Sequence, residues 1–182
     1  MKKIFLSILI ISSLSTFAVE KGDFHVNVTT NLGHHQYIGG VGTKSGGLGF
    51  VPGVTVNMDF AVSPYFSLGG WFTFAGKKYG GDLYKYNYFG IGTRGVFHLY
   101  QLISEKGNAK LDADKFDVYI PLAIGGGFKL KDKNYAGDKF RGGAIVGAGV
   151  GITYYFVEHI GANLEAGYNE ASYGKIGLAF KF

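Results

Sequence analysis

Few residues of this sequence are suited to chemistry, because the 182 positions include no cysteine and only five histidines. Without cysteine the chain has no disulfide, no thiol nucleophile and no zinc site built on thiolates. Acyl transfer by a serine needs a histidine beside the serine and an acid that orients the histidine. The histidines are His25, His34, His35, His98 and His159.

The first candidates for such a serine site stand in two segments, 33–49 and 169–173, that we expect to be loops at one rim of the fold. They contain His34, His35, Ser45, Glu170 and Ser172. No histidine has a serine two residues after it, the local spacing expected of a lipid-hydrolysing site. Adjacent histidines rarely bind one metal ion from a rigid element, so His34 and His35 are better explained as solvated loop residues. We predict no catalytic residue, no metal and no cofactor, and a protein that is not an enzyme.

A glycine pattern at 90–95 matches the dinucleotide-binding fingerprint G-x-G-x-x-G. That fingerprint needs a strand before it and a helix after it. Here the surrounding residues alternate between polar and apolar, as in a continuous strand, and no helical pattern follows. We therefore exclude a nucleotide-binding loop, and nothing in the sequence specifies nucleic acid as a partner.

The first 18 residues have the pattern of a secretory signal peptide. Lys2 and Lys3 precede an apolar stretch at 4–14, and Thr16 and Ala18 are small residues at the positions required for cleavage. The alternative is a membrane anchor, but the stretch is too short to cross a hydrocarbon core of about 30 Å comfortably. We predict a signal peptide at 1–18 and one domain at 19–182. Losing Lys2 and Lys3 lowers the net charge from +5 to +3.

The rest of the chain contains eight segments in which polar and apolar residues alternate. In the first of them Phe24, Val26 and Val28 alternate with His25 and Asn27. This period of two indicates a strand with one polar and one apolar face. The segments are 24–32, 50–62, 66–75, 88–99, 116–128, 144–156, 160–168 and 174–182. Each has about the length of a strand that crosses a membrane, so we predict an all-β fold, an eight-stranded antiparallel up-and-down transmembrane β-barrel.

The connections and the aromatic residues fit this barrel. Segments 33–49, 76–87 and 129–143 are long and polar, whereas 63–65 and 157–159 are short, as expected of outer loops and inner turns. Segment 100–115 is longer than an inner turn needs to be. On the apolar faces, aromatic residues gather at the strand ends, which disfavours a soluble β-sandwich. They are Phe24, Phe60, Phe66, Phe97, Phe116, Phe156 and Phe182 at the inner end, and Phe50, Phe74, Phe89, Phe128 and Tyr168 at the outer end.

The C-terminal segment carries a family resemblance. Lys175, Gly177, Phe180 and the terminal Phe182 resemble the β-signal of bacterial outer-membrane proteins. The chain from residue 19 onward resembles the small eight-stranded barrels of the OmpX/OmpA type, and the strand that begins at Asp117 is similar to one found in that group. The resemblance implies a bacterial outer-membrane location, contact with outer-membrane lipid and lipopolysaccharide, and recognition of the last strand by the barrel assembly machinery.

An eight-stranded barrel encloses a space that is filled by side chains. The charged residues in the inward phase are Asp59, Arg94, Asp117, Glu165, Lys175 and Lys181, whose formal charges cancel. Counting from the strand ends puts Arg94 and Glu165 at mid-height, where we expect them to pair. Asp59, Asp117 and Lys181 are expected nearer the inner end, together with His25 and His98. Stability by itself is enough to explain why these buried charges cancel. The alternative is that the charges gate a narrow pore for small solutes.

The outer connections are basic, with nine lysines and arginines against four acids. The candidates for surface binding are Lys77, Lys78, Lys131, Lys133, Lys139 and Arg141. Such side chains suit phosphate groups of lipids, acidic glycans or a host surface. We therefore expect a structural or adhesin-like role at the cell surface. The alternatives are a narrow pore and a lipid A-modifying enzyme, an activity known among barrels of this size.

Overall fold

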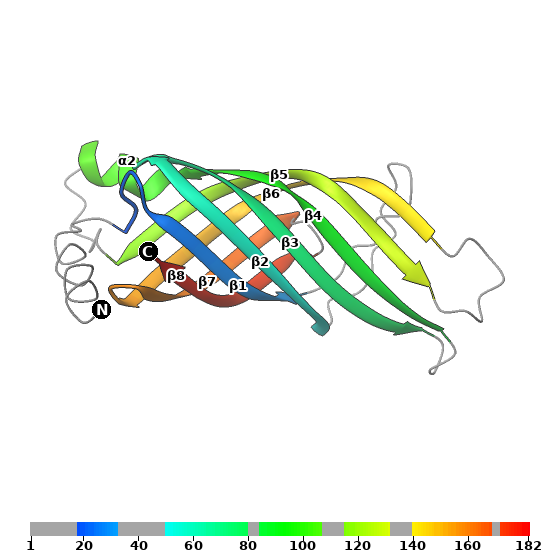
Figure 1. The fold of residues 1–182 in the computed structure, drawn as a ribbon. Helices are drawn as coiled ribbons and strands as arrows, with labels where there is room; N and C mark the ends of the chain where they lie inside the picture. The colour runs from blue at the N-terminus through cyan, green and yellow to red at the C-terminus, as the bar shows by residue number, and fades with distance from the viewer. Residues whose placement is uncertain (1–17, 33–49, 80–83, 107–114, 132–139, 169–171) are drawn as a thin grey trace, which may run out of the picture.

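A computed structural model describes residues 18–32, 50–79, 84–106, 115–131, 140–168 and 172–182 (Figure 1). Within these ranges only the backbone is described for 50–52, 76–79, 84–87, 104–106, 129–131 and 140–141. The strands are β1 (Phe24–Leu32), β2 (Phe50–Ser63), β3 (Phe66–Tyr79), β4 (Tyr84–His98), β5 (Phe116–Lys131), β6 (Phe140–Val157), β7 (Ile160–Tyr168) and β8 (Gly174–Lys181). One short helix, α2 (Leu99–Lys106), follows β4.

The eight strands form a closed barrel in which each strand pairs antiparallel with its neighbours in the sequence. The last strand closes the barrel on the first, with His25 opposite Lys181 and Leu32 opposite Gly174. The predicted fold is therefore confirmed, and each predicted segment corresponds to one strand. We call the end where β1 begins and β8 ends the inner end, and the opposite end the outer end.

The strands from β3 to β6 extend further at the outer end than the alternation indicates. The hairpin of β3 and β4 stays paired up to Tyr79 and Tyr84, and the β5–β6 pair reaches Leu130 and Phe140. The expected loops 76–87 and 129–143 are thus partly strand, and those predicted boundaries are wrong. The reason is that ladder hydrogen bonds join backbone groups, so a hairpin continues without the alternation of side chains that marks a membrane-facing strand.

The long inner connection begins with helix α2, which lies at the same end of the barrel as the C-terminus (Figure 1). Tyr100 and Gln101 of this helix are buried, whereas Ile103 is 55% exposed. Residues 107–114 of the connection lie outside the described residues. In the described part of the chain, no helix has the length and apolar character needed to cross a membrane.

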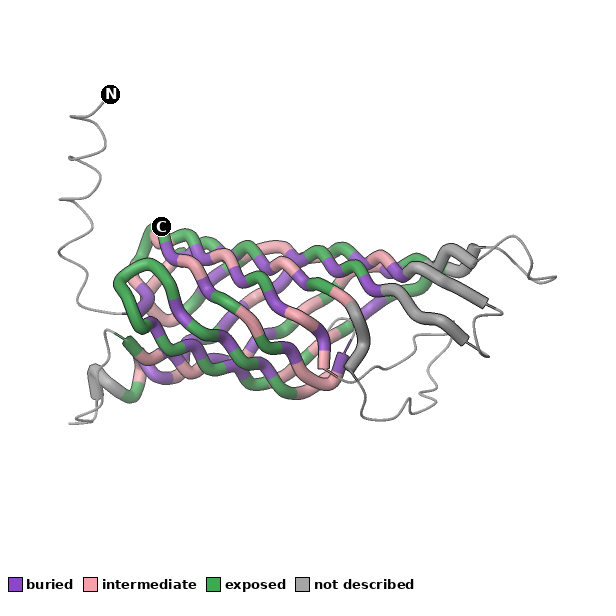
Figure 2. The backbone as a smooth tube through the Cα atoms, turned by 90° about the horizontal axis from the view of Figure 1, so that it is seen from below, coloured by how far each residue is buried: buried purple, intermediate pink, exposed green. Residues whose placement is uncertain are grey.

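The two faces of the barrel wall have opposite character. Side chains at alternate positions are buried and exposed along each strand (Figure 2). The buried ones include polar residues such as Ser67, Thr73 and Asn163, whereas apolar ones such as Ile91 and Ile124 are 61% exposed. This is the reverse of a water-soluble protein, whose apolar residues cover its core. The barrel thus places its polar face in the lumen and its apolar face outside.

The outer half of the lumen contains a cluster of apolar side chains. Trp71, Ala75, Tyr88 and Ile145 form one buried cluster. Glycines make space for the largest of them: a Cβ atom added at Gly125 would lie 2.6 Å from the Trp71 ring, and Gly90 is nearly as close. Further down, a Cβ at Gly151 would collide with the ring of Tyr119. These glycines are needed for the volume they leave to aromatic neighbours.

We predict that Gly151→Val destabilises the barrel by about 1–3 kcal/mol, because the new side chain overlaps Tyr119. The matched control is Gly143→Val on the same strand, where an added Cβ meets no atom within 4 Å. The measurement is the free energy of unfolding in urea, followed by the fluorescence of Trp71. Equal stability of the two variants would show that the lumen accommodates the extra volume.

Candidate functional site

The middle of the lumen holds four charged side chains from four strands. Arg94 on β4 places Nη2 3.0 Å from Glu165 Oε1 on β7, and its Nε lies 3.3 Å from Asp59 Oδ1 on β2. Lys175 on β8 places Nζ 2.6 Å from Glu165 Oε2. All four side chains are buried. Two cations and two anions make the cluster neutral, which compensates for the cost of removing these charges from water.

Neutral groups complete the hydrogen bonding around Glu165. The hydroxyl of Tyr119 donates to Glu165 Oε1 at 2.9 Å, and Asn163 Nδ2 donates to the same hydroxyl at 2.6 Å. Asn163 Nδ2 also lies 2.9 Å from the hydroxyl oxygen of Thr153. In the strand register, Glu165 lies between Gly151 and Lys175. One carboxylate therefore links β4, β5 and β8 to β7.

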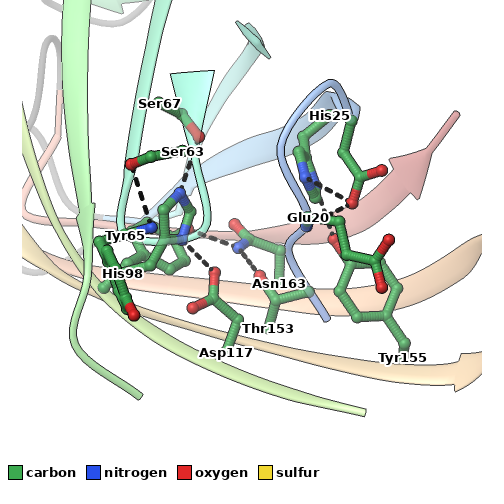
Figure 3. A network of polar contacts seen from close by, with 12 residues as sticks. Glu20, His25, Ser63, Tyr65, Ser67, His98, Asp117, Thr153, Tyr155 and Asn163 are labelled. Carbon is green, nitrogen blue, oxygen red and sulfur yellow. Dashed lines mark hydrogen bonds and ion pairs between the residues drawn. The ribbon is translucent and has the colours of Figure 1, made fainter. Parts of the chain in front are cut away.

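Nearer the inner end, two histidines anchor a second polar group (Figure 3). His98 Nδ1 lies 2.8 Å from Asp117 Oδ2, and His98 Nε2 lies 2.8 Å from the hydroxyl of Ser67. His25 Nδ1 lies 2.9 Å from the hydroxyl of Tyr155, and the centroids of the two imidazole rings are 6.4 Å apart. The Lys181 ammonium lies 5.6 Å from the centre of the Tyr155 ring, a cation–π contact.

The segment that precedes β1 packs at the inner end. Val19 is buried, and the backbone N–H of Gly22 donates a hydrogen bond to the carbonyl of Ala61. The backbone N–H of Glu20 donates to Asp23 Oδ2 at 2.7 Å. Burial raises the pKa of the Asp23 carboxyl above its ordinary value, although this hydrogen bond acts in the opposite direction.

A small cavity of about 10 Å³ separates the two polar groups and has room for about one water molecule. Its wall includes His25, Asp59, Arg94, His98 and Asp117. On the outer side, the apolar cluster around Trp71 fills the lumen. Among the described residues, no group of three or more acids and histidines is arranged to hold a metal ion.

The structure brings the lumen residues selected from the sequence into two polar groups. Arg94 meets Glu165, while Asp117 meets His98 and Lys181 lies beside Tyr155. Asp59 lies opposite His25, near the inner end as expected, and also contacts Arg94, while Lys175 joins Arg94 through Glu165. The residues that resemble a β-signal lie on β8 or directly after it: Lys175 is buried in the lumen, Gly177 lies opposite Thr29, and Phe180 lies opposite Val26, followed by an exposed Phe182.

Most of the proposed surface residues fall where side chains are not described. Lys77, Lys78, Lys131 and Arg141 belong to the extended strands, where the backbone alone is described, and Lys133 and Lys139 lie outside the described residues. The rim candidates His34, His35, Ser45 and Glu170 also lie outside them. Ser172 is described, and its hydroxyl donates to the carbonyl of Gly174 at 2.7 Å.

Sequence reasoning missed Ser67, Thr153, Tyr155 and Asn163 as members of the polar groups. Their inward phase was readable, because each alternates with exposed apolar neighbours. The alternation does not show how neighbouring strands are aligned with each other. In the structure Ser67 lies opposite Val96, but its hydroxyl is within hydrogen-bond distance of His98, two residues further along β4.

We predict that Glu165→Gln lowers the free energy of unfolding by about 3–5 kcal/mol, because it leaves two buried cations with one buried acid. The double variant Glu165→Gln/Lys175→Met retains one cation and one anion, so it should lose less stability than Glu165→Gln alone. Both are measured by urea titration of the folded barrel in detergent. A double variant that is less stable than the single one would contradict charge balance as the governing factor.

Comparisons with protein-family models and with curated proteins find no match for this sequence. The fold, in contrast, is similar to several solved structures. The crystal structure of Ail, the attachment invasion locus protein of Yersinia pestis, has a TM-score of 0.55 and 12% identity, covering 90% of this chain and 100% of that chain. Neisserial surface protein A has a TM-score of 0.56 and 10% identity, covering 88% and 97%.

The N-terminal β-barrel domain of Pseudomonas aeruginosa OprF has a TM-score of 0.50 and 12% identity, covering 90% of this chain and 98% of that one. At identities this low, the comparison shows that the fold is similar and says nothing about a ligand. The closed antiparallel topology, the polar lumen and these likenesses agree. The chain has the fold of the small eight-stranded outer-membrane β-barrels of the OmpX/OmpA type.

Proposed function

We propose that this protein is a bacterial outer-membrane barrel that displays basic loops at the cell surface, where they bind acidic groups. The observation that carries the proposal is the exposed apolar outer face, which includes Ile91, Ile124 and Leu122. A surface of this kind is stable in lipid and unstable in water. The proposal includes the signal peptide at 1–18, which brings the chain out of the cytoplasm before the barrel forms.

The aromatic residues support the position of the barrel in the membrane. Phe24, Phe66 and Phe97 are exposed at the inner end, and Phe74 and Phe128 are exposed towards the outer end. Aromatic side chains prefer the two membrane–water interfaces, so the two groups mark the inner and outer boundaries of the lipid. In this orientation both chain ends lie in the periplasm, and the β-signal on β8 meets the barrel assembly machinery from there.

The basic outer segments suggest the class of ligand. Nine basic residues against four acidic ones give this end an excess of positive charge. Ail, which has a similar fold at 13% identity, has been crystallised with the heparin analogue sucrose octasulfate. By this analogy we propose that the loops bind polysulfated or polyphosphorylated groups, either on acidic glycans of a host surface or on lipopolysaccharide. Lysine and arginine side chains provide the charge for both.

The alternatives from the sequence have less support. A solute pore requires a continuous path, whereas Trp71, Tyr88 and Ile145 fill the outer half of the lumen and the charged cluster occupies its middle. A lipid A-modifying site at the outer rim would use His34, His35 or Ser45, which lie outside the described residues, or Ser172, whose hydroxyl is bonded to a backbone carbonyl. We retain the surface-binding role as the proposed function.

The location is tested by fractionation and by gel mobility. We expect the protein in the outer-membrane fraction, and we expect its migration in detergent gels to change after boiling, because a closed barrel resists unfolding until it is heated. Recovery in the soluble fraction with the same mobility before and after boiling would overturn the proposed location and the barrel together.

The binding role is tested with immobilised heparin. One variant replaces Lys77, Lys78, Lys131, Lys133, Lys139 and Arg141 by glutamine. It should elute at a lower salt concentration, because fewer positive charges attract the sulfated matrix and less salt is needed to screen them. The smaller variant Lys77→Gln/Lys78→Gln has a matched control, Lys21→Gln/Lys115→Gln, which removes the same charge at the inner end. Equal elution of these two pairs would show that net charge, and not the outer loops, governs retention.

A further inference from the structure

Helix α2 turns its apolar residues away from the barrel. Residues three and four apart share one face of a helix, so Leu99, Leu102 and Ile103 form one apolar stripe. Tyr100 and Gln101 lie on the opposite face and are buried, whereas Ile103 is 55% exposed and the two leucines are half-buried. The helix packs against β5. Its more polar face therefore meets the barrel, and the apolar stripe is the more exposed one.

The helix begins at the inner edge of the apolar wall and lies at the rim of the barrel (Figure 1). Leu99 directly follows β4, and Phe97, two residues earlier, is exposed among the aromatic residues that we place at the inner boundary of the lipid. Phe97 lies opposite Phe66 on β3. The backbone N–H of His98 donates to the carbonyl of Tyr65, in the turn before β3, at 2.9 Å. These contacts hold the first turn of α2 at the depth of the lipid headgroups.

Ile103 stays within reach of lipid whatever the tilt of α2. Four residues of helix advance by about 6 Å at most, and the headgroup region on each side of the hydrocarbon core is about 5–8 Å thick. The side chains of a helix also lean towards its N-terminus, so Ile103 leans back towards Leu99 and the end of the wall. An interfacial helix buries an apolar stripe of this kind at the boundary between headgroups and acyl chains.

We propose that α2 is an interfacial helix that rests on the periplasmic leaflet of the outer membrane, with Leu99, Leu102 and Ile103 in contact with phospholipid. The inference rests on the proposed outer-membrane position of the barrel and adds a lipid contact at its inner rim. Residues 99–115 contain three lysines and three acids, so attraction to anionic headgroups does not drive the contact. The apolar area drives it, and the contact should be the same on zwitterionic and on anionic lipid.

The test uses the folded barrel in phosphatidylcholine nanodiscs, which leave both membrane faces open to water-soluble reagents. Because the chain has no cysteine, the variant Ile103→Cys carries a single nitroxide label. Ile124→Cys, on the exposed wall, provides the lipid reference. Glu158→Cys, exposed between β6 and β7, provides the aqueous reference at the inner end. Paramagnetic resonance then compares the collisions of each label with oxygen, which concentrates in lipid, and with a neutral nickel chelate, which stays in water.

We expect the ratio of oxygen to nickel collisions at position 103 to lie nearer that of Ile124→Cys than that of Glu158→Cys, with or without phosphatidylglycerol in the nanodisc. A label at 103 that behaves as in water, or that neither reagent reaches, overturns the interfacial helix. In that case a lipid-like label at 124 leaves the location of the barrel standing. Water-like labels at both 103 and 124 overturn the location together with the inference. A lipid contact that appears only with phosphatidylglycerol overturns apolar area as its cause.

A second measurement leaves the stripe without a label. In the same nanodiscs, amide hydrogen exchange of residues 99–106 should be about tenfold faster in Ile103→Ser than in wild type, because losing the buried isoleucine surface favours local opening. The matched control Ile103→Leu keeps an apolar side chain and should exchange as wild type does. Unchanged exchange in β4 and a change of gel mobility on boiling verify that each barrel is folded. Equal exchange of Ile103→Ser and Ile103→Leu would overturn the proposed contact.

Discussion

The requirement that buried charges be paired governs the interior of this barrel. Its apolar residues face outwards, so the polar residues of every strand face a closed lumen that holds little water. Glu165 makes most of these pairs: it forms ion pairs with Arg94 and Lys175 and accepts a hydrogen bond from the hydroxyl of Tyr119. Because these partners come from β4, β8 and β5, a single carboxylate fixes the relation of strands on opposite sides of the wall. Removing one partner leaves a charge that no water can solvate.

The second constraint is volume, and it divides the lumen into two halves. Eight strands leave a space that side chains alone must fill. In the outer half, Trp71, Tyr88 and Ile145 share it with the hydrogen-bonded Asn31, Thr55 and Thr73, and glycines on β4 and β5 provide the clearance for Trp71 and Tyr88. In the inner half, mostly polar and aromatic side chains leave a cavity of about 10 Å³.

Much of this arrangement is readable from the sequence, for a physical reason. A period of two fixes which face each residue occupies, so the strands, the inward phase of Arg94 and Glu165 and the aromatic ends are predictable. The diagonal step between neighbouring strands is not encoded in that period. Ser67 was therefore visible as an inward polar residue but not as a partner of His98. The extended outer hairpins were also missed, because backbone hydrogen bonding continues where the alternation ends. Helix α2 was missed too, because a period of two gives no sign of a helix.

The pairing of β1 with β8 has a consequence for how the molecule is made. His25 and Lys181 face each other across the seam, although one opens the first strand and the other ends the last. The seam cannot form until the C-terminal strand is available, and joining such distant segments carries a large entropic cost before any contact compensates for it. Until then the wall has two unpaired edges and an apolar face in water. A newly synthesised chain is therefore exposed to aggregation until its final strand pairs with its first.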